Sequence, residues 1–166
     1  MKLTGQPITT IREQLTALLQ GGNAHMGFED AVKSFPTDFV NKKPPHIPYS
    51  FWHLLEHIRI AQWDILEFIR DPEHVTPEWP VNFWPPQDKI ADEAMWNETL
   101  RIIRSDLKSF EDLVNDPETE FFSPIPHALK YNIFRQILLV ADHNAYHISE
   151  LITLRQTMGI PVPGGW

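Results

Sequence analysis

Hydrophobic residues recur at helical spacing along the chain, in stretches separated by clusters of glycine and proline. The first stretch, 9–20, carries leucine and isoleucine side chains three or four residues apart, and Gly21-Gly22 separates it from a second stretch at 24–34. These two stretches predict either one kinked helix or two helices. No segment keeps the two-residue alternation of a strand, so the pattern indicates an all-α fold class.

Longer helices are predicted in the rest of the chain. One covers 51–70, where Ser50 is a typical N-cap residue, and the next covers 87–115. The last covers 129–158, and Gly159 stands where a glycine commonly ends a helix. The apolar positions expected to face the core in the 87–115 helix are Ile90, Ala94, Leu100, Ile103, Leu107 and Phe110.

The segment 71–86, between the two central helices, is rich in proline and contains Trp79, Phe83 and Trp84. So much apolar surface is untypical of a disordered linker, and it predicts an ordered crossover anchored by its aromatic side chains, with a pocket lid as the alternative. We therefore expect a four-helix bundle with a long crossover loop, as a single domain over 1–166. The long crossover leaves a strict up-down-up-down order open.

Polar residues of the last helix crowd into one arc of the helical wheel, formed by Arg135, Asp142, Ser149 and Thr153. The remaining arc is largely apolar, and such a helix is buried on more than one side. Either it lies centrally in the bundle or part of it faces another subunit. We expect a homodimer.

Composition narrows the class of protein. The 166 residues are 42% hydrophobic and 22% charged, which is ordinary for a globular domain. The chain has no cysteine, which excludes disulfides and thiolate metal ligands and fits a cytoplasmic location. The net charge is −8 without a cluster of Lys or Arg, which argues against nucleic-acid binding. We expect no signal peptide and no membrane span, because no apolar run is long enough.

Four of the 8 histidines form two pairs in which the residues are four apart. His53 and His57 lie on the helix predicted at 51–70, and His143 and His147 lie on the last helix. Residues four apart share a helix face, so two imidazoles can reach one cation from there. Each pair lies at the edge of an apolar stripe, where buried ring nitrogens need partners. A divalent metal between the two helices would supply them.

Two acidic residues accompany these histidines. Asp64 lies on the same line of the helix as His57, and Glu150 lies one turn beyond His147. Either carboxylate is a candidate general base, and Glu150 is also a candidate partner of a metal-bound ring. The other histidines lie in or near loops without a spaced partner, and we expect structural roles for them; they are His25, His46, His74 and His127.

Signatures of several other enzyme classes are missing. The chain has no glycine-rich phosphate loop, no nucleophile elbow and no metalloprotease motif with paired histidines around a glutamate. The carboxylates near position 92 lack a histidine at the spacing of a di-iron centre, which argues against a ferritin-like site.

Two segments resemble a known family. They are Tyr49-Ser-Phe-Trp-His-Leu-Leu-Glu-His57-Ile and Ala141-Asp-His143-Asn-Ala-Tyr-His147-Ile-Ser-Glu-Leu, which look like the two signature helices of the DinB/YfiT-like superfamily. The resemblance implies a four-helix bundle, commonly homodimeric, with a three-histidine site for a divalent metal such as zinc or nickel. The matching ligands are His57, His143 and His147, whereas His53 has no counterpart in the common motif and is a candidate additional pocket residue. The Gly21–His25 stretch is similar to one subgroup, which makes His25 a candidate pocket residue.

The resemblance leaves three hypotheses for function. The first is a metal-dependent transferase that uses a low-molecular-weight thiol as cofactor or co-substrate. The second is a metal-dependent hydrolase with Glu150 or Asp64 as general base. The third is a non-enzymatic metal-binding protein that responds to stress. The metal, the substrate and the reaction are not distinguished by the sequence, because imidazole ligands suit several divalent ions.

Overall fold

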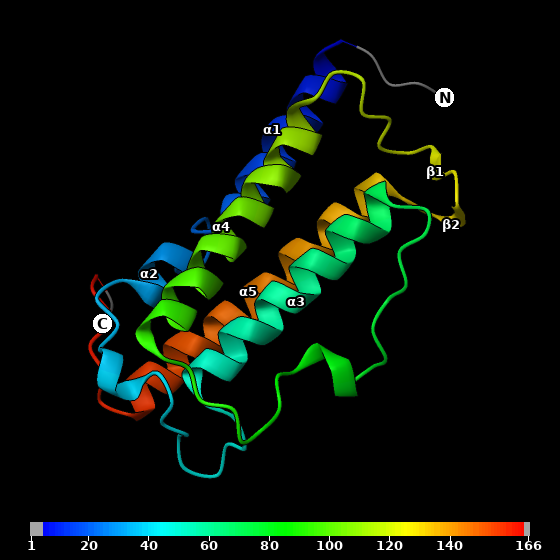
Figure 1. Ribbon diagram of the computed structural model, residues 1–166. Helices are drawn as coiled ribbons and strands as arrows, with labels where there is room; N and C mark the ends of the chain where they lie inside the picture. The colour runs from blue at the N-terminus through cyan, green and yellow to red at the C-terminus, as the bar shows by residue number, and fades with distance from the viewer. Residues whose placement is uncertain (1–4, 165–166) are drawn as a thin grey trace.

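The computed structural model describes residues 5–164, and both ends of the predicted domain, 1–4 and 165–166, lie outside the described residues. Four long helices, α1, α3, α4 and α5, pack as a bundle. Figure 1 shows α1 beside α4 and α3 beside α5. The all-α fold class predicted from the sequence is confirmed. Among the described residues, no helix is long and apolar enough to cross a membrane.

The N-terminal part of the chain forms two separate helices. Helix α1 spans Gln6–Gln20 and begins three residues earlier than predicted, because Pro7 is tolerated in a first helical turn. Helix α2 spans Phe28–Val32 and is much shorter than the predicted 24–34. The loop between them includes Gly21 and Gly22, both with positive φ, which ends the first helix.

Helix α3 spans Phe51–Arg70, as predicted. The Ser50 hydroxyl accepts the backbone N–H of His53 at 3.4 Å, which confirms its role as N-cap. A crossover with a short 3₁₀ turn, η2 (Val81–Phe83), then returns along the bundle. As Figure 1 shows, α3 and α4 therefore begin at the same end and run parallel. The order of directions is not strictly alternating.

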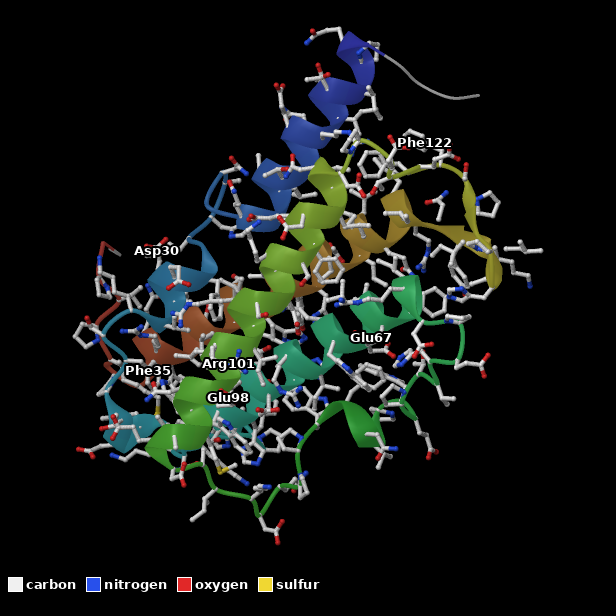
Figure 2. All side chains as sticks on the ribbon, turned by 45° about the horizontal axis from the view of Figure 1, so that its top comes forward. Asp30, Phe35, Glu67, Glu98, Arg101 and Phe122 are labelled. Atoms are coloured by element: carbon white, nitrogen blue, oxygen red, sulfur yellow. The ribbon has the colours of Figure 1, made fainter. Side chains whose placement is uncertain are left out.

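Helix α4 spans Glu93–Asn115 and starts six residues later than predicted. Asp92 caps it by accepting the backbone N–H of Met95 at 2.8 Å. The predicted core stripe is wrong at its beginning: Ile90 is 73% exposed and precedes the helix, and Ala94 is also exposed. Trp96 takes the first buried position instead. Figure 2 shows Glu98 and Arg101 on this helix, where they form an exposed ion pair.

A small hairpin precedes the last helix and was not predicted. Its strands are β1 (Pro124–Ile125) and β2 (Ala128–Asn132), paired antiparallel. Helix α5 spans Ile133–Thr157 and therefore begins four residues later than the predicted 129. Asn132 caps it by accepting the backbone N–H of Arg135 at 2.9 Å. Gly159 follows its end with φ +67°, as expected for a C-terminal glycine.

The hydrophobic core has two parts with a polar layer between them. One part joins α2, the first halves of α3 and α4, and the end of α5. The other joins α1, the ends of α3 and α4, and the start of α5. Between these parts lie Gln62 and Asn144, both buried, with the Asn144 amide donating to the Gln62 side-chain oxygen at 2.9 Å. The buried rings of His57 and His147 belong to the same middle segments of α3 and α5.

Candidate metal centre

Three histidines from two helices converge at this polar layer. Nε2 of His57 lies 3.1 Å from Nε2 of His147 and 3.1 Å from Nε2 of His143. One ring nitrogen from each of the three lies within 4.8 Å of the other two. Helix α3 supplies the first ring, and two successive turns of α5 supply the others. This is the set of ligands that the sequence predicts, brought together by the packing of α3 against α5.

His57 is fixed from its other side by the crossover. Its Nδ1–H donates to the backbone carbonyl of Phe83 at 2.8 Å. The indole of Trp84 stacks on the imidazole, with ring centres 4.1 Å apart and planes 1° from parallel. The ring is only 1% exposed, and this burial lowers the pKa of His57, with a smaller contribution from the nearby His147.

His147 is fixed by a chain of two side chains. Its Nδ1–H donates to one carboxylate oxygen of Glu150 at 2.9 Å, and the other oxygen accepts the hydroxyl of Tyr49. Burial alone would raise the pKa of Glu150, but the hydrogen bonds from His147 and Tyr49 outweigh it and hold that pKa below its ordinary value. Burial and the neighbouring Glu150 raise the pKa of Tyr49. Glu150 is therefore an ionised acceptor that orients a ring, as metal-bound histidines commonly require.

His143 is the least supported of the three rings. Its Nδ1 is buried without a hydrogen-bond partner among the described residues. Burial, followed by repulsion from His147 and His57, lowers the pKa of His143 to about 4. The ring is therefore neutral at physiological pH.

The tautomers of these rings show that the cluster fits a cation. A carbonyl or carboxylate cannot donate, so the Nδ1 atoms of His57 and His147 carry the hydrogens. In the neutral form of these rings the Nε2 atoms carry the lone pairs, and those of His57 and His147 face each other at 3.1 Å. Two nitrogens that each lie about 2.1 Å from one ion are roughly 3.0 to 3.4 Å apart. A divalent ion would turn this repulsion into coordination.

Comparison with known proteins agrees with this geometry. The family model described as the DinB superfamily matches residues 22–151, which include all three histidines and most of the chain. The chain belongs to the DinB superfamily. Searches of curated proteins and of solved structures gave no match. In this DinB protein, the three clustered histidines lie within the matched residues.

Other predicted site residues of the DinB protein lie apart from the cluster. Nε2–H of His53 donates to the Pro86 carbonyl at 3.0 Å, and Nδ1 lies 2.6 Å from the Ser50 hydroxyl, so both ring nitrogens are engaged. Asp64 accepts Nε2–H of His74 at 2.8 Å. That histidine, expected to be structural, joins the crossover to α3.

His25, a candidate pocket residue, belongs to the loop between α1 and α2. Its Nδ1–H donates to the neighbouring Met26 carbonyl at 2.8 Å, and the residue is exposed. The metal-competent group of the described residues contains neither His25 nor His53 nor Asp64.

Aromatic side chains around the rings are the part of the site that spacing did not reveal. Trp84 stacks on His57 and also packs against Tyr49, with ring centres 4.8 Å apart. Trp79 and Tyr146 are 68% and 69% exposed, and their rings lie 6.3 Å from His57 and 4.8 Å from His147. The crossover thus anchors itself on the metal centre and also forms one of its walls. In the sequence, only the cluster of aromatic residues between prolines indicated that the crossover is part of the site.

Proposed function

We propose that this DinB protein is a divalent-metal-dependent transferase that joins a low-molecular-weight thiol to an electrophile. The hydrogen bonds of the Glu150 carboxylate are the observation that favours a thiol over water as the nucleophile. Both of its carboxylate oxygens already accept hydrogen bonds, from His147 and from Tyr49, which hold its pKa below the ordinary value and make it a weak base for water. Asp64, the other candidate base, is held by His74. A thiol needs no such base, because its pKa is only about 8.5 even before a metal binds it.

The residues divide the work as follows. His57, His143 and His147 supply three neutral nitrogens for zinc or nickel and leave positions open for a small molecule. Phe83 and Glu150 fix two of the rings, and Trp84 shields His57 from water. A divalent ion held there favours the thiolate form of a bound thiol. The S–H proton passes to solvent, sulfur bonds to the electrophilic carbon, and the leaving group departs with its electron pair. Such thiols are abundant in the cytoplasm, where we place the protein.

The test joins metal content to thiol chemistry. Protein loaded with zinc or nickel is mixed with a low-molecular-weight thiol and a halogenated aromatic electrophile, and loss of thiol is followed. We expect consumption above the uncatalysed rate, and its loss in the double variant His143→Gln/His147→Gln together with the bound metal. His127→Gln is the matched control, because His127 lies on the hairpin and bonds only the Phe68 carbonyl. His53→Gln should keep its metal.

Each alternative has its own outcome. Ester or amide turnover without thiol would replace the proposal with a hydrolase. Stoichiometric metal with neither activity across a broad substrate screen would leave a metal-binding protein. Full metal content in the double variant would show that the ligands are assigned wrongly, whatever the activity.

A further inference from the structure

A cavity of about 770 Å³ lies next to the metal centre without including it. Its walls are the segment just before α3, with Tyr49, the first turn of α3, with His53, and the crossover, with Val81 and Trp84. None of the three clustered histidines lines it. Trp84 and Tyr49 therefore lie between the cavity and the metal centre, since they line the cavity and also contact His57 and Glu150.

Hydrogen bonds and prolines in the walls fix the shape of the cavity. His53 is 3% exposed, and its ring ties the Pro86 carbonyl of the crossover to Ser50 at the start of α3. Several of the other wall residues are prolines, whose φ is fixed. His53 is not one of the three clustered histidines, but it holds the two walls of the cavity together. A preformed cavity of this size is typical of small-molecule sites.

The lining selects the chemistry of a ligand. No acidic residue, lysine or arginine is among the described residues that line the cavity. Tyr49 and Trp84 offer aromatic ring surface, and Asn82 and Gln87 offer neutral amides that both donate and accept hydrogen bonds. A charged ligand would find no carboxylate, ammonium or guanidinium in the lining itself, and the Lys43 ammonium beside it already donates to the Gln87 carbonyl at 3.3 Å. The net charge of −8 further disfavours anions.

We propose that this cavity binds an uncharged aromatic compound that carries a hydrogen-bonding group. The ring packs against Tyr49 and Trp84, and the polar group reaches Asn82 or Gln87. The site is distinct from the metal centre, so its occupation does not require a metal and does not depend on the proposed thiol transfer.

The test uses 2-naphthol as the probe and isothermal titration calorimetry on metal-free and zinc-loaded protein. We expect binding to both forms, with a Kd of about 1 mM or lower for a ligand of this size. The anion 2-naphthoate, which has a similar ring system, should bind at least tenfold more weakly. Absence of binding to the metal-free protein, or equal binding of the anion, would overturn the proposal.

Two valines of the crossover locate the site. Val81 lines the cavity and is 68% exposed, whereas Val75 is 82% exposed and does not line it. Val81→Trp fills the cavity and should weaken 2-naphthol at least tenfold, while Val75→Trp should stay within twofold of the parent chain. Both positions are exposed, so circular dichroism melting should show that each variant folds. Equal affinity in the two variants would place the probe elsewhere.

The two proposals fail separately. Binding of 2-naphthol to metal-free protein depends on the cavity alone, and thiol consumption depends on the three histidines. Protein that binds the probe without transferring thiol would refute only the proposed function. Protein that transfers thiol without binding the probe would refute only the cavity.

Discussion

At the scale of residues, the three histidines differ in what holds their Nδ1 atoms. A backbone carbonyl holds His57, a carboxylate holds His147, and nothing among the described residues holds His143. Protonation of His143 would place a positive charge in a buried position beside two other rings. This is why its pKa falls to about 4.

The depressed pKa predicts how the stability of the metal-free protein changes with pH. In the unfolded chain His143 takes up a proton near pH 6.5, whereas in the folded chain it does so only near pH 4. Between these values the unfolded state binds more protons, so the free energy of unfolding falls as the pH falls. The shift corresponds to about 3 kcal/mol lost across this window, with no loss from this group above pH 6.5. His57, whose pKa is also lowered, acts in the same direction.

Urea unfolding of metal-free protein between pH 7.5 and pH 4 measures this slope. His143→Gln should flatten the dependence, because glutamine does not titrate, and His127→Gln should leave it as in the parent chain. A slope in His143→Gln equal to that of the parent would mean that another group causes the loss.

Spacing predicted two histidine pairs and the acidic neighbour Glu150, the family resemblance selected His57 over His53, and neither predicted the rest of the site. His143, His147 and Glu150 lie on one helix, so helical periodicity alone brings them together. Trp84 and the Phe83 carbonyl belong to a segment without long regular structure, where spacing carries no information about contacts. Tyr49 precedes the N-cap of α3, so no helical wheel places it.

At the scale of elements, the start of α4 depends on a contact across the fold. The side-chain amide of Asn41 donates to the Ala91 carbonyl at 2.7 Å, and its oxygen accepts the Ala91 N–H at 2.8 Å. Both backbone groups of Ala91, a buried residue, are thus paired outside a helix. Helix α4 begins just afterwards, at the Asp92 cap.

Removing this contact should loosen the end of the crossover. Asn41→Ala leaves two buried backbone groups unpaired, and we expect the free energy of unfolding to fall by about 2 kcal/mol. Hydrogen exchange at the Ala91 amide should become faster. Asn97→Ala is the matched control, because Asn97 is exposed on α4, and it should change stability by less than about 0.5 kcal/mol. Unchanged exchange at Ala91 in Asn41→Ala would show that other contacts hold the segment.

A helix end was predicted correctly where the residue that sets it is a close neighbour in the sequence, and was missed where that residue is distant. The bounds of α3 were predicted because Ser50 is a local cap. The start of α4 was missed although Asp92 is a local cap, because the contact that pairs Ala91 outside the helix comes from Asn41, 50 residues away. The hairpin was missed because β2 is short and most of its side chains are exposed, so it has no alternating pattern. Local causes are visible in a sequence, and distant ones are not.

At the scale of the whole molecule, the stacking of Trp84 on His57 and the parallel pair α3–α4 have one origin. The crossover returns along the bundle, which makes α4 begin beside the start of α3 and brings Trp84 over His57. The sequence predicted a bundle with a long crossover, but its hydrophobic pattern does not record direction. The division of the core into two clusters depends on how the helices pack against one another, which the pattern along the chain does not record.

The wide apolar arc of α5 is not fully covered by the other helices. Part of it is buried by α1 and α3, but Leu138 and Leu139 are each 39% exposed, and Leu129 on the adjoining strand is 75% exposed. We propose that this surface packs against a second copy of the chain, which would bury the leucines. Sedimentation should then give twice the chain mass of 19.3 kDa.

Leu138→Glu places a charge on the proposed interface and should give the mass of a single chain. Leu18→Glu is the matched control: Leu18 is 45% exposed on α1, which is not part of the proposed interface, and its variant should keep the mass of the parent. A parent chain that sediments as a monomer would refute the dimer outright. A dimer that both variants leave intact would refute this surface, because the subunits would then meet through another face.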